Sequence, residues 1–195
     1  MKKRLILVAA PPACGKTYVS ELLAKRLSPA VYLDKDDLAP MVRKSFALCG
    51  EALDMDGKFY RDNLRSAEYE TILGLAFSTL RFASTVILNA PLGKEVRDTE
   101  YMRALKEKSN ALDADLVFIW VSAPLSVCYE RIKSRNSDRD GWKIAHWEEY
   151  VKHVDYTPPF DLEKADAVDT FFIFDTANEN QTNESMKSIL EILGY

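Results

Sequence analysis

Five short apolar runs divide the chain, at 5–9, 30–33, 85–89, 116–121 and 170–175. Each run is apolar without alternation, which is typical of strands buried on both faces of a parallel sheet. Between successive runs the hydrophobic positions return with a helical period. The pattern therefore predicts an α/β fold in which a parallel sheet of five strands is covered by helices on both faces.

Apolar stripes locate the helices between these runs. One helix is expected after the first strand, ending at Leu27, and a long one at about 64–83. We also expect helical segments at about 95–110, 124–135, 144–154 and 182–193, and a shorter one at 38–48. The stripes are Val19, Leu22, Leu23 and Leu27 in the first helix, Leu64, Ala67, Thr71, Ile72, Leu75, Ala76, Thr79, Leu80 and Ala83 in the longest, and Met186, Ile189, Leu190 and Leu193 in the last.

Residues 10–17 read Ala-Pro-Pro-Ala-Cys-Gly-Lys-Thr and stand between the first strand and the first helix. This order is the layout of a phosphate-binding loop, although an ordinary strand-to-helix turn is the alternative and Ala10 replaces the usual first glycine. Lys16 would bridge the outer phosphates, and the Thr17 hydroxyl would bind Mg²⁺. Since Pro11 and Pro12 lack an N–H, we expect the phosphate donors at Ala13, Cys14, Gly15, Lys16, Thr17 and Tyr18.

The chain has three cysteines, Cys14, Cys49 and Cys128, without the spacing of metal ligands, which favours a reducing compartment. Cys14 lies beside Lys16 at a helix N-terminus, so we expect the pKa of its thiol to be lowered. In the alternative interpretation Cys14 is only a small residue that fits the loop.

Polar residues follow several of the strands. The carboxyl ends of parallel strands meet at one edge, where ligands bind. Asp34, Asp36 and Asp37 follow the second strand. We expect Asp34 in the magnesium sphere, directly or through water, and Asp36 on the hydroxyl of a phosphoryl acceptor. One of these carboxylates can instead cap the next helix, and Asp37 is the candidate for that role.

The third strand ends in Asn89, where many nucleotide-binding proteins have a carboxylate that helps to hold magnesium. Asparagine supplies no negative charge, so the charge around the metal would come from Asp34 and the phosphates. This departure argues against an autonomous ATPase.

A basic segment follows the fourth strand. Arg131 and Arg135 are four residues apart and are expected on one side of a helix, where they would close over the phosphates as part of a lid at about 131–155. We assign Arg131 to the nucleotide and Arg135 to the transition state. A solvated basic helix face is the alternative.

Four more arginines are candidates for binding an anionic group of the acceptor: Arg43, Arg61, Arg65 and Arg97.

Composition narrows the class of protein. A chain of 195 residues, 47% hydrophobic and 29% charged, predicts one domain over 1–195 with a sizeable core. The net charge of −4 argues against a broad nucleic-acid-binding face. No apolar window approaches the roughly 18 residues of a membrane span. We expect a cytoplasmic protein without membrane partners.

With these motifs the chain resembles the P-loop kinases of the nucleoside-monophosphate-kinase-like superfamily. It is most similar to the AAA-like or zeta-toxin-like ATP-binding kinases, and also to shikimate, gluconate and chloramphenicol phosphotransferases. The resemblance rests on residues 10–17, on Leu-Asp-Lys-Asp-Asp-Leu at 33–38, on Val-Ile-Leu-Asn-Ala-Pro at 86–91 and on Trp-Val-Ser-Ala-Pro at 120–124. It implies a three-layer P-loop NTPase fold with strand order 2-3-1-4-5, a helical lid, ATP with Mg²⁺, and Asn178 near the adenine.

We therefore expect a kinase that moves the γ-phosphoryl of ATP to a small-molecule acceptor, and an acceptor hydroxyl is favoured because the second strand ends in carboxylates rather than arginines. Lys16, Asp36 and Arg135 are the expected catalytic residues. Two alternatives stay open: an ATP-binding regulatory module with little or no turnover, and a kinase acting on nucleotides or nucleic-acid ends.

Overall fold

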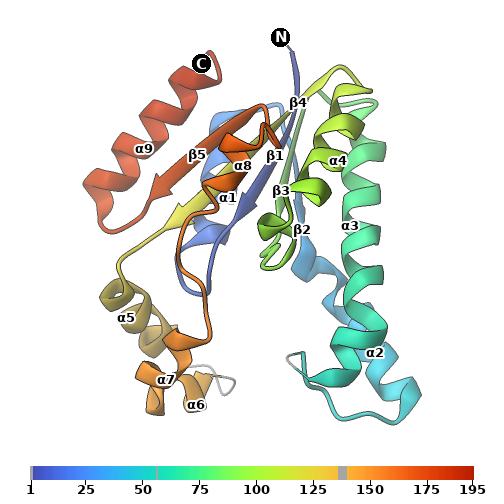
Figure 1. The fold of residues 1–195 in the computed structure, drawn as a ribbon, viewed down its shortest axis with the longest axis vertical. Coiled ribbons are helices and arrows are strands. Elements are labelled where there is room, and N and C mark those ends of the chain that lie inside the picture. Colours follow the sequence, from blue (N-terminus) through green and yellow to red (C-terminus); the bar gives the residue numbers. More distant parts are fainter. Residues whose placement is uncertain (1, 56, 136–139) are drawn as a thin grey trace.

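The sheet has the predicted architecture. The computed structural model describes residues 2–55, 57–135 and 140–195 (Figure 1). All strand pairings are parallel and the order is β2-β3-β1-β4-β5, which confirms the order implied by the resemblance. The strands are β1 (Lys3–Ala9), β2 (Val31–Asp34), β3 (Thr85–Asn89), β4 (Ala114–Ser122) and β5 (Thr170–Asp175).

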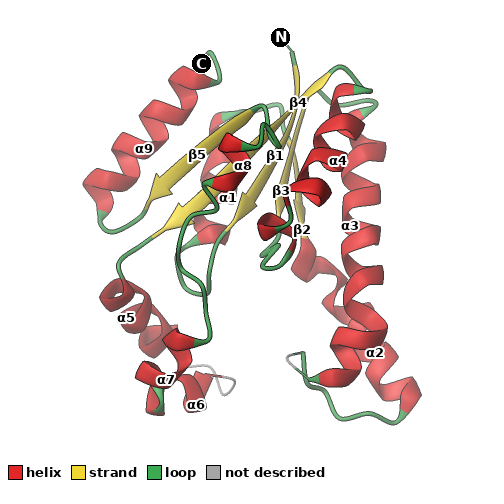
Figure 2. Ribbon diagram, in the orientation of Figure 1, coloured by secondary structure: helices red, strands yellow, loops and turns green. Residues whose placement is uncertain are grey.

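Helices cover both faces of this sheet (Figure 2). On one face lie α3 (Arg65–Leu80), α4 (Thr99–Asn110) and the short α8 (Asp161–Lys164); on the other lie α1 (Lys16–Arg26) and α9 (Glu179–Ile192). Alternate residues of β1 pack against the helices on opposite faces of the sheet. Leu5 and Leu7 belong to one apolar cluster, and Ile6 and Val8 belong to the other. None of the described helices has the length and apolarity required to span a membrane.

Two groups of helices extend from the carboxyl edge of the sheet (Figure 1). The first, which we call the arm, comprises α2 (Ala39–Cys49), the π-helical turn η2 (Tyr60–Leu64) and the N-terminal half of α3. Its small core is formed by Val42, Phe46 and Tyr60. The second comprises α5 (Leu125–Arg135), α6 (Gly141–Ala145) and α7 (Trp147–Lys152). Two short 3₁₀ helices, η1 (Lys35–Leu38) and η3 (Glu95–Arg97), follow β2 and β3.

The buried face of α3 differs from the predicted stripe. Ala67, Thr71 and Leu75 are exposed, whereas Tyr69 and Leu73 are buried together with the predicted Ile72, Ala76 and Leu80. The buried face is thus rotated relative to the predicted one: it includes Tyr69 and Leu73 and leaves Leu75 at the surface. The stripes of the first and last helices are confirmed by the burial of Val19, Leu23, Leu27, Met186, Ile189 and Leu193.

Candidate active site

The loop between β1 and α1 has the backbone of an anion-binding turn. Ala13 and Gly15 adopt left-handed conformations, with φ of 66° and 93°. Gly15 is the N-cap of α1, and no side chain caps the helix there. A Cβ at Gly15 would lie 3.4 Å from Nη1 of Arg131 and 3.5 Å from Oγ1 of Thr176. Glycine therefore suits both the conformation and the narrow space of this position.

The start of α1 leaves backbone donors unpaired. Val19 N–H donates to the Gly15 carbonyl at 3.0 Å, and Cys14 N–H turns back to the Pro11 carbonyl at 3.4 Å. Within the described parts of the chain, the other predicted donors make no hydrogen bond: the N–H groups of Ala13, Gly15, Lys16, Thr17 and Tyr18. Unpaired amides at the positive end of a helix fit a phosphate chain. Cys14 is the one predicted donor whose amide is engaged within the loop.

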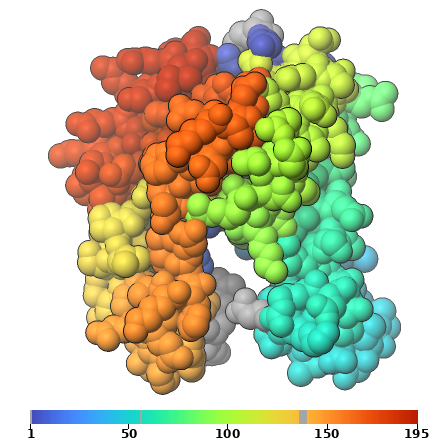
Figure 3. All heavy atoms as spheres, in the orientation of Figure 1, coloured from blue at the N-terminus to red at the C-terminus, as the bar shows by residue number. Residues whose placement is uncertain are grey.

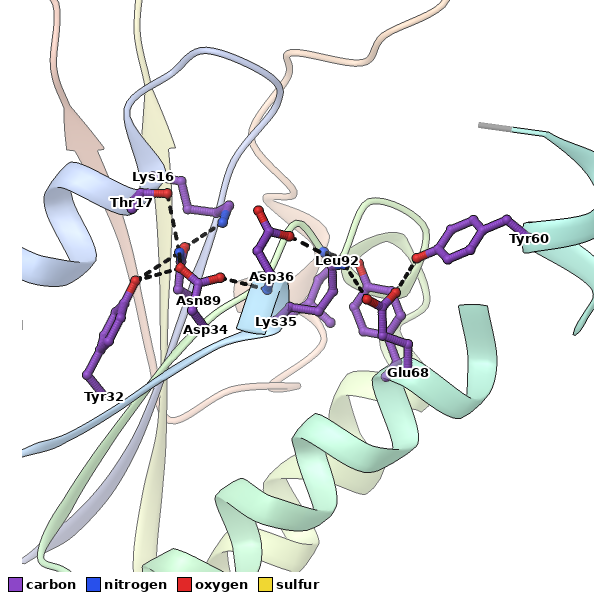
Figure 4. A network of polar contacts seen from close by, with 11 residues as sticks. Lys16, Thr17, Tyr32, Asp34, Lys35, Asp36, Tyr60, Glu68, Asn89 and Leu92 are labelled. Carbon is purple, nitrogen blue, oxygen red and sulfur yellow. Dashed lines mark hydrogen bonds and ion pairs between the residues drawn. The ribbon is translucent and has the colours of Figure 1, made fainter. Parts of the chain in front are cut away.

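A network of polar side chains joins this loop to the ends of β2 and β3 (Figure 4). Lys16 Nζ donates to Oδ1 of Asn89 at 2.5 Å. The Asn89 amide nitrogen donates to Oδ2 of Asp34 at 2.5 Å, to the Tyr32 hydroxyl at 3.1 Å and to Oγ1 of Thr17 at 3.3 Å. Strand register places Asp34 beside Asn89, and Asn89 beside Val8 at the end of β1.

The network explains why the third strand ends in an amide. Asn89 is fully buried, and its two amide atoms face groups of opposite character. An ammonium can only donate and a carboxylate can only accept, so the amide oxygen must face Lys16 and the nitrogen must face Asp34. A carboxylate at position 89 would repel Asp34, whereas asparagine bonds to both neighbours.

Replacing this amide tests the assignment. We expect Asn89→Asp to place two carboxylates in contact, so that one of them stays protonated in the folded protein with a raised pKa. The folded variant then binds one more proton than the unfolded chain above about pH 4, and its stability falls with rising pH. The free energy of unfolding of the variant, relative to that of wild type, should therefore fall by about 1–3 kcal/mol between pH 4 and 7. Urea denaturation at both pH values measures it.

The same change at the exposed Asn110 is the matched control. Asn110→Asp should show the same small effect at both pH values. If Asn89→Asp loses the same free energy of unfolding at pH 4 and at pH 7, the contact with Asp34 is contradicted.

Asp34 is held by donors on both of its oxygens. Oδ2 accepts from Asn89 and, at 2.8 Å, from the Tyr32 hydroxyl, and Oδ1 accepts from Asp36 N–H at 2.9 Å. Burial raises the pKa of Asp34, but these hydrogen bonds and the charge of Lys16 outweigh it, so the pKa lies below its usual value. Asp34 is the N-cap of η1, and the next helix, α2, has Leu38 at its N-cap and no side-chain cap, so the prediction that Asp37 caps it is wrong.

These bonds decide how the site fits a metal ion. No cluster of three or more histidine, cysteine, aspartate or glutamate ligands occurs among the described residues. The Thr17 hydroxyl lies at the exposed start of α1 and fits one position of Mg²⁺. Because both oxygens of Asp34 already accept hydrogen bonds, Asp34 fits the metal through water better than directly. Most ligands would therefore have to come from phosphates and water.

Burial lowers the pKa of Lys16, while the charges of Asp34 and Asp36 oppose that shift. An ammonium with little access to water gains more from an anionic ligand than an exposed one does. The position of Lys16 therefore favours binding of a polyphosphate.

Asp36 faces open space, with its side chain 80% exposed (Figure 4). Beneath it lies Lys35, whose Nζ is 3.6 Å from Oδ1 of Asp36 and 3.0 Å from Oε1 of Glu68. Lys35 and Glu68 are both buried, and the Tyr60 hydroxyl donates to the other oxygen of Glu68. Sequence reasoning missed this group, which ties the arm to the end of β2.

A second ion pair is formed by Arg65, the first residue of α3. Arg65 donates to both oxygens of Glu95, at 2.5 and 2.9 Å, and its guanidinium stacks on the ring of Tyr69 at 4.6 Å. Burial raises the pKa of Tyr69 to about 12, and its hydroxyl accepts from Leu92 N–H at 3.2 Å. Arg65 is thus paired within the protein in this conformation.

The remaining arginine candidates lie in different surroundings. Arg97 pairs with Asp155 at 3.1 Å, donates to the Thr157 carbonyl and stacks on Trp120 at 5.4 Å. It therefore fastens the segment after α7 to η3. Arg43 and Arg61 are exposed on the arm.

The two arginines of α5 have separate partners. Arg131 reaches the phosphate-binding loop, where it donates to the Ala13 carbonyl at 3.3 Å, to Thr176 Oγ1 at 3.0 Å and to the Thr176 carbonyl at 2.7 Å. Arg135 instead pairs with the buried Asp140, at 2.6 and 2.8 Å. The structure thus brings Arg131 to the loop but not Arg135. Part of the predicted lid, 136–139, lies outside the described residues.

Two more candidates lie on the nucleotide side, and one prediction about them needs correction. Asn178 is the N-cap of α9, where its Oδ1 accepts from Gln181 N–H at 3.0 Å. The prediction about Cys14 is wrong: a hydrogen bond with Cys128 and burial raise the pKa of its thiol. Only 1% of Cys14 is exposed, and the hydrogen bond and burial outweigh the charge of Arg131, which lowers the pKa of the thiol.

Two hollows adjoin these residues. Figure 3 shows the molecule hollowed between the arm and the group of α5–α7, below the carboxyl edge of the sheet. A separate open depression of about 480 Å³ runs along α5. It is lined by Ser126, Val127, Glu130, Arg131 and Ser134.

Comparisons with known proteins agree with this geometry. The model of a family described as AAA domain matches residues 5–155. A candidate kinase structure from Chloroflexus aurantiacus j-10-fl has 22% identity and a TM-score of 0.64, over 99% of this chain and 97% of that chain. Shikimate kinase from Bacteroides thetaiotaomicron has 12% identity and a TM-score of 0.58, over 100% of both chains.

The APS kinase of Mycobacterium tuberculosis, solved with AMPPNP and APS, has 13% identity and a TM-score of 0.53, over 100% of this chain and 99% of that chain. No protein of curated function matches the sequence. At such identities the likeness shows the fold alone, and that fold is the P-loop NTPase fold that the resemblance implies.

Proposed function

The chain belongs to the AAA domain family, and we propose that it is an ATP-dependent phosphotransferase acting on a hydroxyl of a small molecule. One observation carries the proposal. The unpaired amides at the start of α1, the ammonium of Lys16 and the exposed carboxylate of Asp36 meet at one edge of the sheet. Phosphoryl transfer needs these two functions side by side, a cradle for phosphates and a group that receives the acceptor proton.

The loop residues bind and hold the phosphates. The amides of Gly15, Lys16 and Thr17 donate to phosphate oxygens, and the Lys16 ammonium leaves Asn89 to neutralise the outer phosphates. ATP, when bound with Mg²⁺, supplies the γ-phosphoryl group. Thr17 would hold the metal through its hydroxyl, and Asp34 would contribute through a water molecule.

Asp36 orients the acceptor and takes its proton. Its exposed carboxylate accepts a hydrogen bond from the acceptor hydroxyl and then receives that proton on Oδ. The acceptor would occupy the hollow between the arm and α5–α7 (Figure 3). Carboxylates at the end of β2 and the pairing of Arg65 with Glu95 support a hydroxyl, rather than a nucleotide phosphate, as the acceptor group.

Residues on the other side of the phosphate-binding loop would contact the nucleotide. Arg131 braces the loop through the Ala13 carbonyl and stands at the depression along α5, which suits an adenine ring. Asn178 begins α9 on the same side, near Thr176. We assign residues 131–155 to a lid, and closure of that lid would have to free Arg135 from Asp140 for it to reach the transition state.

Lys16→Ala tests the phosphate cradle. A hydrogen bond to a charged group contributes about 1.5–3 kcal/mol, so we expect ATP affinity to fall roughly 10- to 150-fold. Isothermal titration with ATP measures the loss, and Lys25→Ala, at the far end of α1, is the matched control with no loss. Equal affinity of wild type and Lys16→Ala would remove Lys16 from the site.

A screen for ATP consumption tests the reaction itself. Wild type is incubated with ATP, Mg²⁺ and a panel of small hydroxyl compounds, with Lys16→Ala as the blank. A phosphorylated product formed by wild type alone is the expected result. ATP binding without any product across the panel would instead favour a regulatory module. The lack of a carboxylate at Asn89 is the feature that supports this alternative.

A further inference from the structure

Two thiols that the proposed reaction does not use lie in contact beneath the phosphate-binding loop. Sγ of Cys14 and Sγ of Cys128 are 3.6 Å apart, although the residues are 114 positions apart in the chain. Cys14 belongs to the loop and Cys128 to α5, and the two side chains are buried in one apolar cluster. The third cysteine, Cys49, is exposed at the end of α2.

We propose that Cys14 and Cys128 form a reversible disulfide, a modification site that weakens nucleotide binding when the protein is oxidised by a peroxide. A disulfide has an S–S distance of about 2.05 Å, so the sulfurs must approach by roughly 1.5 Å. Hydrogen bonds hold the backbone of both residues, so closing this gap strains the loop or α5. Thr176 Oγ1 donates to the Cys14 carbonyl at 2.7 Å, and Cys128 N–H donates to the Pro124 carbonyl at 3.0 Å.

The chemistry assigns the two sulfurs different roles. The hydrogen bond with Cys14 lowers the pKa of the Cys128 thiol, burial opposes this, and the positive charge of Arg131 adds to the lowering. Cys128 is therefore the sulfur that ionises first, and its thiolate is the nucleophile. Cys14 keeps its proton and lies in position to react second.

The reaction balances with one peroxide. The Cys128 thiolate attacks a peroxide oxygen, the O–O bond breaks, and a sulfenic acid and hydroxide form. The Cys14 sulfur then attacks the sulfenic sulfur, the S–O bond breaks, and water leaves as the S–S bond forms. In total two thiols give up two electrons and two protons, and hydrogen peroxide becomes two waters. A dithiol reductant reverses the step.

The disulfide would act on the loop through Cys14. The residue stands directly before Gly15 and Lys16, whose amides we assign to the phosphates. Hydrogen bonds of this kind weaken steeply when a donor moves by an ångström or is turned away from its acceptor. Pulling Cys14 toward α5 therefore misplaces the cradle. This effect on nucleotide binding rests on the proposed function, whereas formation of the bond does not.

The experiment uses the full-length protein with the exposed cysteine removed, Cys49→Ser. The protein is treated with hydrogen peroxide, and peptide mass spectrometry without reduction identifies the cross-link. We expect a Cys14–Cys128 linked peptide, and ATP binding that is roughly tenfold or more weaker than in the reduced sample, as when one hydrogen bond to a charged phosphate is lost. Dithiothreitol should restore the affinity.

The control adds Cys128→Ser, with Cys128→Ala as a second version in case serine is poorly tolerated in the apolar cluster. Either should bind ATP like the reduced parent and should not respond to peroxide. The proposal is overturned if peroxide oxidises Cys49 of wild type but leaves Cys14 and Cys128 as thiols, or if the cross-linked protein binds ATP as the reduced protein does. Reduced protein without any affinity for ATP would refute the proposed function instead, and the linked peptide would still report on the disulfide.

Discussion

Asp36→Asn should lower phosphoryl transfer by about 100- to 10,000-fold, the range typical of losing a positioned general base. The amide keeps the size of the carboxylate but cannot take the proton of the acceptor hydroxyl. ATP affinity should stay nearly unchanged, because Asp36 makes no contact with the phosphate-binding loop among the described hydrogen bonds. Steady-state kinetics with the acceptor from the screen, together with isothermal titration of ATP, measure both quantities.

Asp37 offers a matched control for this variant. It is exposed, carries the same charge and lies one residue farther along η1. Asp37→Asn should transfer the phosphoryl group at nearly the wild-type rate. If Asp36→Asn is as active as Asp37→Asn, Asp36 is not the group that receives the proton.

Glu68→Gln should destabilise the folded protein by about 3 kcal/mol, because it leaves the buried ammonium of Lys35 without its nearest counter-charge. The side chain of Glu68 is only 1% exposed and that of Lys35 only 7%, so water cannot replace the lost partner. The nearby Asp36 carboxylate, at 3.6 Å, compensates in part. Urea denaturation followed by circular dichroism measures the change in the free energy of unfolding.

Two further variants separate charge from packing. Glu100 pairs with Arg103 at the exposed surface of α4, so Glu100→Gln should change stability by less than about 1 kcal/mol. Replacing both buried partners, as Lys35→Met with Glu68→Leu, should recover most of the loss, because an apolar pair needs no counter-charge. A double variant less stable than Glu68→Gln would contradict this explanation.

The sheet could be predicted because its strands are apolar on both faces, and the loop because Gly-Lys-Thr stands between a strand and a helix. Burial of charged residues could not. Lys35 lies in a run of charges, Asp34-Lys35-Asp36-Asp37, which indicates a solvated turn. Its partner Glu68 is 33 positions away, and only the packing of α3 against the end of β2 brings the two together.

Asn89 and Cys14 show the same limit in the site itself. The sequence indicates only that Asn89 replaces a magnesium ligand; in the structure it is the amide that joins Lys16 to Asp34. The sequence predicts that Cys14 responds to the helix N-terminus and Lys16, but its thiol faces Cys128. Neighbours in sequence set the backbone of the loop, and residues distant in sequence set the environment of its side chains.

The central claim is that backbone amides at the start of α1 form a cradle for the phosphates of ATP. Two-dimensional ¹⁵N–¹H NMR, recorded while ATP is added with Mg²⁺, observes those amides one by one. The account predicts that the largest shifts fall on Gly15, Lys16, Thr17 and Tyr18, and that Lys16→Ala needs far more ATP to reach them. Unmoved resonances at these four residues under millimolar ATP, or shifts confined to other parts of the chain, would contradict it.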